Sequence, residues 1–389
     1  MLIVARPSIS TYLARTLAEL QIPVVLTEEM TVPMRPALKT LTLSEVEANS
    51  RHAYRSLLLT NLENALAHLY DVIPYDDRIM KAKIFKDKGA FRRAISKRFP
   101  AFFFREFTPA EIQAIDPATL PYPVILKPSV GISSIGVIRI SRPEQWQPGV
   151  DFLLQDLASY QKNYVASVVE GTTILCESYI EGREFAVDAY YDEAGNPVVL
   201  NILEHLFLNA EDTSDRIYLT HRSLMASLLP SIERFLRELG ELFDLRRFPF
   251  HLEVRQTAAG DLIPIEVNPM RFSGLGTTEI AQYAYGINVY EHFFKQLRPD
   301  WKALLDREDD SFYVFLCADV PTEIFRTPGL KIDDRRFARE FSEVLEYRLL
   351  DENETSTFAV VFFRTPSLEE CRKFLSMDFK QFLTVPQVP

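Results

Sequence analysis

The sequence predicts a mixed α/β and α+β protein with more than one domain. At 389 residues the chain is longer than one ordinary domain, so two or three compact units are expected. Its beginning alternates strand and helix patterns, as a parallel sheet requires. A β-rich middle follows, and the C-terminal part repeats a strand and helix rhythm without obvious chemistry. The pattern changes to strands from Tyr122, and the C-terminal rhythm covers residues 310–389.

The first elements are short and amphipathic. Residues 1–5 form an apolar strand pattern, and Ser8 or Ser10 is positioned to cap a helix that runs to Leu20. Residues 22–27 then form a second β-rich run. No GxGxxG follows the first strand, so the dinucleotide-binding fingerprint is absent.

Two further helices are predicted before the middle region. Residues 44–70 carry leucines along one helical face and are expected to form one helix. Residues 80–98 form a second helical stretch, dense in Lys and Arg. The leucines of the first stretch are Leu57, Leu58, Leu62, Leu66 and Leu69.

The middle region is dominated by short strands, with one long helix. The helix covers residues 221–240, where apolar residues recur at spacings of three and four. A hairpin follows, with a turn of sequence AAGD at residues 258–261. The strand patterns cover residues 122–128, 135–141, 173–180, 184–191, 198–208, 250–257 and 262–269.

Composition excludes several classes of function. The formal net charge of −11 argues against general nucleic-acid binding, which needs a basic face. The first apolar run ends at Arg6, too early for a signal peptide, and no apolar stretch is long enough to span a membrane. Three widely spaced cysteines (Cys176, Cys317 and Cys371) argue against disulfides and zinc. We therefore expect a cytoplasmic protein.

Oxygen ligands are concentrated on the hairpin. Glu266 and Asn268 point to the same side of one strand because side chains alternate along a strand. If the hairpin pairs across its turn, Glu253 falls opposite them. Three hard oxygen ligands on one sheet face suit a magnesium ion bound together with phosphates. A solvated hairpin is the alternative, but Leu252, Val254, Ile265 and Val267 are expected to fill the other face.

A Gly/Ser-rich loop follows the strand that carries Lys127. Residues 129–136 include Ser133 and Ser134, and such a loop closes its N–H and hydroxyl groups over a triphosphate. Lys127 supplies a fixed positive charge for the phosphates. Alone this pattern is weak, because Gly/Ser loops often only turn the chain.

A third element lies at residues 176–185. Glu177, Tyr179 and Ile180 end a strand whose free backbone groups and apolar side chains suit an adenine ring, and Glu184 suits the ribose hydroxyls. An ordinary amphipathic strand explains this stretch equally well.

Taken in this order, the three elements resemble the ATP-grasp superfamily, in particular the D-alanine–D-alanine ligase and carbamoyl-phosphate synthetase branches. VILKPSVGISSIGV and IEVNPMRFSG carry the resemblance, which covers about residues 80–297. It implies an ATP-grasp fold at residues 81–305 with a lid at about 120–175. A Rossmann-like pre-ATP-grasp domain at 1–80 and a small α+β cap at 306–389 complete the expected chain.

The resemblance also implies a role for each motif residue. Lys127 and a second lysine, Lys88 in preference to Lys86, are expected to bind the phosphates of ATP beneath the loop with Ser133 and Ser134. Two magnesium ions are implied, with manganese as an alternative. Their expected ligands are Glu253, Glu266 and Asn268. The implied adenine hinge is Glu177, Ser178, Tyr179 and Ile180, with Glu184 on the ribose.

Other polar residues near these motifs are ambiguous. Arg271 and Arg255 are candidates to stabilise the transferring phosphoryl group, although Met270 places Arg271 one position later than the common pattern. His205 is more simply explained as a satisfied core histidine than as a substrate contact. The acidic stretch at 209–215, with the arginines that follow it, is either a substrate loop or a solvated one.

The expected activity is ligation driven by ATP and magnesium. A substrate carboxylate becomes an acyl phosphate, and an amine attacks it with release of ADP and phosphate. The expected partners are small carboxylates and amines, not nucleic acid or membrane, and a homodimer is typical of such ligases. The alternatives are a thiol or other acceptor, a carboxylase-like enzyme, a non-catalytic nucleotide-binding regulator, or an enzyme of unrelated class.

Overall fold

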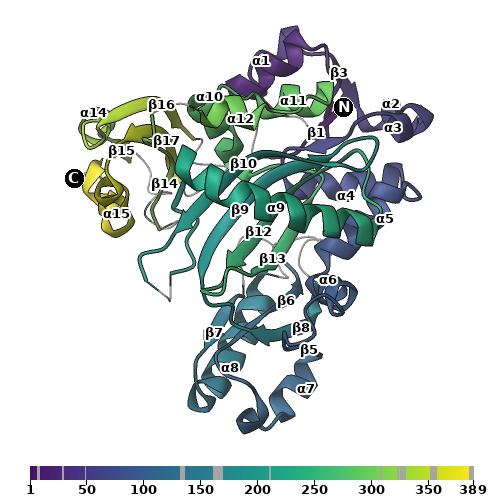
Figure 1. Cartoon of the computed structure of the whole chain (residues 1–389), viewed down its shortest axis with the longest axis vertical. Helices are drawn as coiled ribbons and strands as arrows, with labels where there is room; N and C mark the ends of the chain where they lie inside the picture. The colour runs from purple at the N-terminus through teal and green to yellow at the C-terminus, as the bar shows by residue number, and fades with distance from the viewer. Residues whose placement is uncertain are drawn as a thin grey trace.

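A computed structural model provides the structure of the chain. It describes residues 1–6, 9–28, 30–48, 50–131, 136–160, 170–209, 212–306, 309–321, 324, 330–350 and 357–384. A broad antiparallel sheet lies at the centre of Figure 1. A smaller sheet lies below it, and the N-terminal sheet and the C-terminal elements lie above it on opposite sides.

The N-terminal unit is a four-stranded parallel sheet with the order β3-β2-β1-β4. Its strands are β1 (Leu2–Val4), β2 (Val24–Leu26), β3 (Thr40–Thr42) and β4 (Leu59–Thr60). Helix α1 (Thr11–Glu19) begins at Ser10, whose side chain accepts a hydrogen bond from the backbone N–H of Leu13. The predicted start of the chain and one of its two candidate caps are thereby confirmed.

The single helix predicted over residues 44–70 is wrong. A strand, β4, interrupts it, because Leu59 pairs with Leu2 of β1 and both residues are buried. An apolar run of this length fits a buried parallel strand as well as a helix face, and sheet pairing decides between them. The helices of this stretch are α2 (Leu43–Ala48), α3 (Ser50–Arg55) and α4 (Glu63–Val72).

The basic stretch predicted at residues 80–98 is helical but divided. Helix α5 spans Asp77–Lys86 and helix α6 spans Lys88–Ile95. Asp87 has an extended backbone, and its side chain accepts from the N–H of Ala90, so it caps α6 and forces the break. This break determines the directions in which the flanking lysines point.

A second sheet, with its own hydrophobic core, forms the part that we call the lid (residues 104–178). Its strand order is β5-β8-β6-β7, and the strands pair antiparallel. Helices α7 (Pro109–Ala114) and α8 (Trp146–Tyr160) pack against it. The strands are β5 (Phe104–Phe107), β6 (Val124–Val130), β7 (Ile138–Ile140) and β8 (Glu170–Ser178). Its buried residues form a cluster of their own, separate from those of the other sheets.

The central sheet has eight antiparallel strands in the order β13-β12-β9-β10-β11-β14-β17-β16. Helix α9 (Arg222–Phe243) crosses one face of it (Figure 1), as the predicted amphipathic pattern requires. The strands are β9 (Arg183–Tyr191), β10 (Pro197–Leu206), β11 (Ile217–Thr220), β12 (Phe248–Gln256), β13 (Leu262–Pro269), β14 (Phe312–Asp319), β16 (Glu343–Leu349) and β17 (Thr357–Thr365).

The C-terminal part has the predicted α+β composition, but its main strands do not form a separate sheet. Strands β14, β17 and β16 extend the central sheet from β11. Helices α14 (Asp334–Ala338) and α15 (Leu368–Ser376) cover them over a core rich in phenylalanine. A short pair, β15 (Lys331–Ile332) and β18 (Leu383–Thr384), closes this unit, and α10 (Ile280–Tyr285), α11 (Val289–Lys295) and α12 (Trp301–Leu305) connect it to β13.

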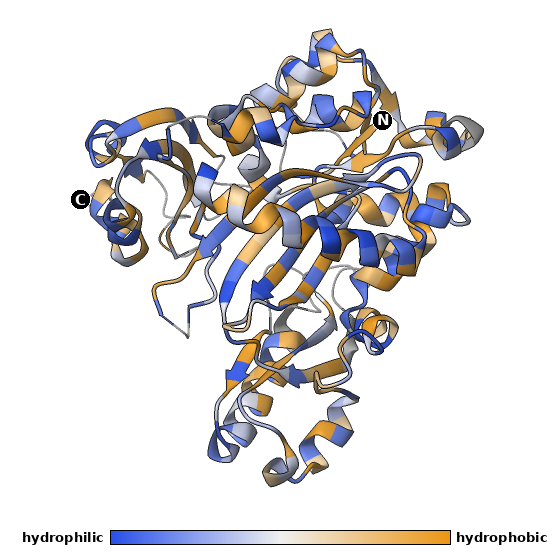
Figure 2. Cartoon of the chain, in the orientation of Figure 1, coloured by the Kyte–Doolittle hydropathy of each residue, from blue (hydrophilic) through white to orange (hydrophobic). Residues whose placement is uncertain are grey.

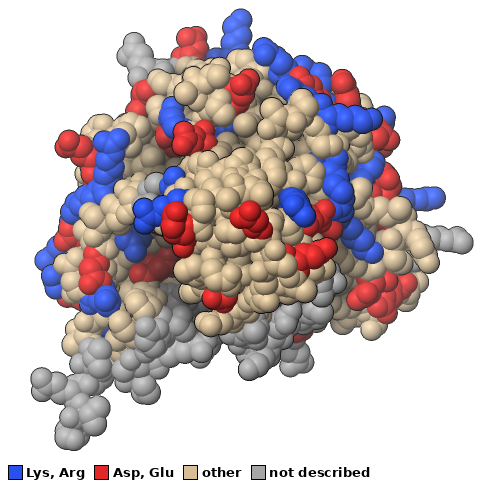
Figure 3. All heavy atoms as spheres, turned by 90° about the horizontal axis from the view of Figure 1, so that it is seen from below, with Lys and Arg blue, Asp and Glu red and all other residues tan. Residues whose placement is uncertain are grey.

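The surface and the core follow the expected division. Hydrophobic residues are frequent in the strands in Figure 2, and Leu224, Leu228, Ile232 and Leu239 of α9 are buried. Lys and Arg alternate with Asp and Glu on the face shown in Figure 3. All three cysteines are free and buried, as small apolar residues are. Among the described helices, none combines the length and the apolar character needed to cross a membrane.

Candidate active site

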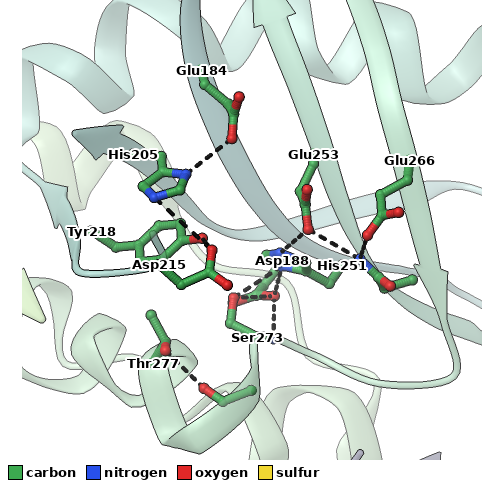
Figure 4. Close-up of polar contacts among 12 residues, drawn as sticks. Glu184, Asp188, His205, Asp215, Tyr218, His251, Glu253, Glu266, Ser273 and Thr277 are labelled. Atoms are coloured by element: carbon green, nitrogen blue, oxygen red, sulfur yellow. Dashed lines mark hydrogen bonds and ion pairs between the residues drawn. The ribbon is translucent and has the colours of Figure 1, made fainter. Parts of the chain in front are cut away.

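The predicted hairpin brings its three oxygen ligands together. Strands β12 and β13 pair with Glu253 directly opposite Glu266. The Nδ2 of Asn268 donates to an oxygen of each carboxylate, at 3.2 Å to Glu253 and 3.0 Å to Glu266. Figure 4 shows the two glutamates side by side on adjacent strands. A cation bound here would require the amide of Asn268 to turn its Oδ1 inward, an orientation that ordinary amide rotation permits.

One neighbour of this group does not behave as predicted. Ile265 was expected on the opposite face, but it is half-buried and lines the same cavity as Glu266. The pairing of β12 and β13 shifts at this point, where Glu253 faces Glu266 and Val254 faces Pro264. Ile265 is the extra residue of a β-bulge, which disrupts strict alternation. Leu252, Val254 and Val267 are buried as expected.

The two carboxylates differ in their electrostatic surroundings. Burial, followed by the like charge of Glu266, raises the pKa of Glu253. Burial also opposes ionisation of Glu266, but Lys88 and Lys86 outweigh it and hold the pKa of Glu266 well below its usual range. Among the described residues no three His, Cys, Asp or Glu form a metal-binding group, so this candidate site consists of two carboxylates and one amide. That donor set fits magnesium, whose remaining positions are commonly filled by water and phosphate.

The two candidate lysines, Lys86 at the end of α5 and Lys88 at the start of α6, reach different carboxylates. The Nζ of Lys88 lies 2.7 Å from Glu266, whereas Lys86 pairs with Glu63 of α4. Both also donate to the carbonyl of Gly131, at the start of the Gly/Ser loop. Lys88 lines a cavity between the lid and the central sheet together with the hairpin carboxylates. The geometry therefore favours Lys88 over Lys86, as the sequence did.

Lys127 and Glu177 form a buried ion pair that the sequence did not predict. The Nζ of Lys127 lies 2.7 Å from Glu177, and Arg92 of α6 binds the same carboxylate at 2.6 Å. Burial by itself disfavours the charged Glu177, but Arg92 and Lys127 lower its pKa to about 2. Burial is also the largest influence on Lys127, and together with the charges of Arg92 and Lys88 it outweighs Glu177 and lowers the pKa of the Lys127 ammonium.

The predicted hinge connects the lid to the central sheet. The backbone N–H groups of Ser178 and Tyr179 donate to the carbonyls of Phe103 and Pro123, which fixes the end of β8. The ring of Tyr179 lies between two guanidinium groups, 4.2 Å from Arg139 and 4.8 Å from Arg255. Tyr179 and Ile180 both line the cavity described below.

Glu184 lies just beyond the hinge and is held from two sides. The Nε of Arg255 lies 2.8 Å from one of its oxygens. The Nδ1 of His205 lies 2.9 Å from the other, and Figure 4 shows this second contact. Arg255 also donates to the carbonyl of Ile180, so it lies at the hinge end of the cavity. The pKa of Glu184 is lowered because His205 and Arg255 outweigh its burial.

His205 has both ring nitrogens occupied. Besides Glu184, it contacts the carbonyl of Ser214 at 2.9 Å, and its ring stacks on Tyr218 with centroids 4.2 Å apart. The preferred explanation, a core histidine with a satisfied ring, agrees with these contacts. In the acidic stretch nearby, Asp212 and Asp215 line the cavity. Arg216, which follows this stretch, points elsewhere and donates to the carbonyls of residues 374, 375 and 377.

Arg271 lies at the other end of the hairpin, next to the N-terminal unit. Its Nη2 lies 3.0 Å from Glu63, the carboxylate that also binds Lys86. Met270, the additional residue before it, has a φ of 61° and a buried side chain. The carbonyl of Met270 accepts from the N–H of Thr60 in β4 at 2.7 Å. The left-handed turn at Met270 therefore ties Arg271 to the N-terminal sheet.

A buried polar cluster holds the turn after β13. Asp188 of β9 accepts from the backbone N–H of Ser273 at 2.8 Å and contacts the Nδ1 of His251 at 3.0 Å. The Nε2 of His251 lies 3.7 Å from Glu253, as Figure 4 shows. The cluster thus links a metal-ligand candidate to the turn that carries Arg271.

These groups surround one cavity of about 440 Å³ between the lid and the central sheet. Its size is in the range of small-molecule sites. Its described lining includes, from the predicted site, Lys88, Lys127, Glu177, Ser178, Tyr179, Ile180, Glu184, Glu253, Arg255 and Glu266. Asn268 joins through its hydrogen bonds, and Arg271 lies outside this lining. Ser133 and Ser134 lie outside the residues that the structure describes.

Three polar residues of the site were missed. Arg92, Glu63 and His251 carry no motif of their own, although the basic stretch around Arg92 was noted. For His251 a signal did exist, because it lies two residues before Glu253 and alternation places both on one face. Arg92 and Glu63 come from helices far from the hairpin in sequence, so only the folded chain brings them to it.

Part of the chain is similar to a known protein family. Residues 120–279 match a protein-family model described as an ATP-grasp domain. No curated protein shows significant sequence similarity to the chain.

Several solved structures share the fold over nearly the whole chain. The L-amino acid ligase from Bacillus licheniformis has a TM-score of 0.66 at 18% identity and covers 98% of this chain and 97% of its own. The carboxyaminoimidazole ribonucleotide synthase from Aspergillus clavatus, complexed with ATP, has a TM-score of 0.64 at 14% identity. The match covers 96% of this chain and 96% of the synthase. The biotin carboxylase domain of the Hydrogenobacter thermophilus 2-oxoglutarate carboxylase, in complex with MgADP, has a TM-score of 0.56 at 13% identity. The match covers 94% of this chain and 86% of that domain. At these identities the likeness establishes the fold.

Proposed function

Because residues 120–279 match the model of an ATP-grasp domain, we propose that the protein is an ATP- and magnesium-dependent carboxylate–amine ligase. The carboxylate substrate is activated as an acyl phosphate, and an amine then attacks it. The observation that carries this proposal is the meeting of Lys88 with Glu266, Glu253 and Asn268 at one cavity. A phosphate-binding charge next to hard oxygen ligands is what phosphoryl transfer requires.

We assign the nucleotide along the cavity from hinge to hairpin. The adenine lies at Ser178–Ile180, and Glu184 binds the ribose hydroxyls. Lys127 and Lys88 bind the phosphates, with Ser133 and Ser134 in the loop above them. Arg255, which contacts Tyr179 and Glu184, belongs in this arrangement to the base and ribose end rather than to the transferring phosphate.

The metal ligands of this assignment are Glu253, Glu266 and Asn268, for one or two magnesium ions. Bound magnesium would neutralise charge on the phosphoryl oxygens. Lys88, now paired with Glu266, would then be released towards the phosphates. Arg271, held by Glu63 beside the turn after β13, is the guanidinium we assign to the acyl-phosphate end.

The second chemical step needs no further cofactor. The amine nitrogen bonds to the acyl carbon while the bond from that carbon to the phosphate oxygen breaks. Inorganic phosphate leaves with the bonding electrons, and the nitrogen loses a proton to solvent or to the departing phosphate. The lid closing over the cavity keeps water from the acyl phosphate.

The proposal is tested by measuring nucleotide products. The purified protein is incubated with ATP, magnesium and pools of amino acids, small carboxylates and amines, and ADP and AMP are quantified separately. We expect ADP and phosphate with some pools only. Glu266→Gln should lower this turnover at least about a hundredfold, since a fixed carboxylate that holds the metal is lost.

The matched control is Asp261→Asn, in the exposed turn of the same hairpin, which should keep full turnover. AMP formation would indicate that the carboxylate is activated as an adenylate instead of an acyl phosphate. Tight ATP binding without turnover in any pool would indicate a nucleotide-binding regulator instead.

A further inference from the structure

A second cavity lies on the opposite side of the turn that carries Arg271. It has a volume of about 510 Å³ and lies between the N-terminal sheet, the turn after β13 and strand β16. Thr60 and Asn61, at the carboxyl end of β4, line it together with Phe272 and Ser273. Open α/β sheets bind ligands at the carboxyl ends of their strands. None of the roles assigned above to the nucleotide uses this cavity.

Arg348 of β16 presents unused hydrogen-bond donors to this cavity. Its Nε and Nη2 bind Glu346 at 3.1 and 2.8 Å, and its Nη2 also binds Glu279 at 2.9 Å. Its Nη1 forms no hydrogen bond with any residue that the structure describes. The guanidinium is thus fixed on one side while its remaining N–H groups are free for an acceptor. A carboxylate is the acceptor that this geometry suits best.

Glu279 anchors Arg348 from a buried position. Only 2% of its surface is exposed, and besides Arg348 it accepts from Ser10 at 2.5 Å and from Tyr290 at 3.2 Å. Ser10 also caps helix α1, so the anchor is tied to the N-terminal unit. Three elements far apart in the sequence therefore hold one guanidinium in place.

The turn after β13 leaves space for the ion pair between Arg348 and Glu279. Gly276 has a φ of 80°, and a Cβ atom on it would lie 2.6 Å from the Nη1 of Arg348. A side chain at this position would displace the donor that faces the cavity. The turn therefore positions Arg271 on one side and makes room for Arg348 on the other.

The charges along this cavity favour a molecule with both an amine and a carboxylate. Its charged lining residues, within the part of the chain that the structure describes, are Glu279, Glu346 and Arg348. Together they leave one excess negative charge, which attracts an ammonium group, while Arg348 offers free donors for a carboxylate. A simple dicarboxylate or an organic phosphate would meet two acidic side chains.

We propose that this cavity binds the amine substrate and that this substrate is an amino acid or short peptide, with its carboxylate held by Nη1 of Arg348. The inference rests on the proposed ligase function and specifies its acceptor. The amine is directed towards Phe272 and Ser273, beside the turn that carries Arg271. Held at its carboxylate end, the acceptor leaves its amine free for attack.

The test is binding, measured by calorimetry on the full chain, with and without magnesium and a non-hydrolysable ATP analogue. The probes are the twenty standard amino acids, each as the free acid and as its carboxamide, which keeps the amine and removes the carboxylate. We expect at least one free acid to bind, and its carboxamide to bind about tenfold more weakly or worse, since a hydrogen bond to a charged group is lost.

The role of Arg348 is tested in the same assay. Arg348→Met should reduce the affinity for the free acid to that for the carboxamide, and Arg372→Met, an exposed arginine of α15, should leave both unchanged. Arg348→Lys keeps the charge and serves if the methionine variant fails to fold. Equal binding of acid and carboxamide, an unchanged ratio in the Arg348 variants, or no binding of any amino acid would overturn the inference. Because the assay requires no turnover, a protein that binds amino acids but forms no ADP would refute the ligase proposal alone.

Discussion

At the residue scale, Arg92 holds together the lid side of the candidate site. Its guanidinium is buried, binds Glu177, and donates to the carbonyl of Pro264 in β13 at 2.7 Å. It thus connects the end of lid strand β8 with the hairpin that carries the candidate metal ligands. Glu177 in turn binds Lys127, so three charges share a buried space.

Arg92→Met should destabilise the protein strongly. Without the guanidinium, Glu177 keeps one cation instead of two, and two backbone carbonyls of β13 lose a donor. Breaking a buried ion pair by removing one partner costs about 3–5 kcal/mol. The free energy of unfolding from urea titration measures this loss.

The neighbouring Arg93 provides the control. It also pairs with a glutamate, Glu106, but its side chain is 54% exposed. Arg93→Met should therefore cost less than about 1 kcal/mol. Equal urea midpoints for the two variants would mean that the Arg92 network does not stabilise the fold.

Individual residues of the candidate site differ in whether the sequence alone predicts them. Glu266 and Asn268 were predicted together because alternation along one strand is a local property, and Glu253 followed from the hairpin turn. Arg92 and Glu63 were not predicted because their contacts join helices to strand β13 and to the turn after it, which lie 173 and 208 residues away in the sequence. Ile265 was placed on the wrong face because a β-bulge disrupts alternation.

At the element scale, Gly182 is the tightest point between the hinge and the hairpin. It follows β8 with a φ of 143°, and a Cβ atom there would lie 2.0 Å from the carbonyl oxygen of Gln256 in β12. That oxygen belongs to the backbone and cannot rotate away. The hinge can pass this close to the central sheet only because residue 182 has no side chain.

Gly182→Ala should lower the stability by more than about 2 kcal/mol, through unfavourable φ together with a backbone clash. Gly260→Ala, at φ 87° in the exposed hairpin turn, meets no atom within 4 Å and should lose only the conformational part, about 1–2 kcal/mol. Thermal unfolding of both variants compares the two losses. If Gly182→Ala unfolds at the same temperature as Gly260→Ala, the close approach to β12 is not a constraint.

Elements were predicted well where periodicity was long or a turn was explicit. The helix at residues 221–240 and the hairpin at 250–269 are confirmed by α9, β12 and β13. The stretch at 44–70 was not, because two residues paired in a sheet are too short to produce a strand pattern.

At the scale of the whole molecule, the lid and the central sheet have separate cores. The lid buries its own cluster around Trp146 and Leu153, while the central and N-terminal sheets share another. The candidate nucleotide cavity lies where these bodies meet. Such an arrangement allows the lid to move relative to the body without disrupting either core.

We therefore expect lid backbone amides in β6 and β7 to exchange with deuterium faster than those in β9 and β12. Magnesium and a non-hydrolysable ATP analogue should slow lid exchange, because a ligand that binds across the two bodies stabilises the closed form. Hydrogen-exchange mass spectrometry measures both effects. Glu266→Gln should weaken the protection of the lid amides that the ligand confers. Ligand-induced protection of β9 and β12 without protection of β6 and β7 would argue against closure of the lid.

The sequence by itself predicted local groups: the three oxygen side chains of the hairpin, the Glu177–Ile180 stretch, Lys127 on its strand, and the alternating start of the N-terminal sheet. Each of these depends on residues a few positions apart, where the period of a strand or helix dictates direction. Only the tertiary structure decided that β14, β17 and β16 extend the central sheet, that Arg92 shares Glu177 with Lys127, and that Glu279 and Arg348 meet at a second cavity. These pairings join residues separated by tens to hundreds of positions, and burial against other elements, rather than local pattern, selects them.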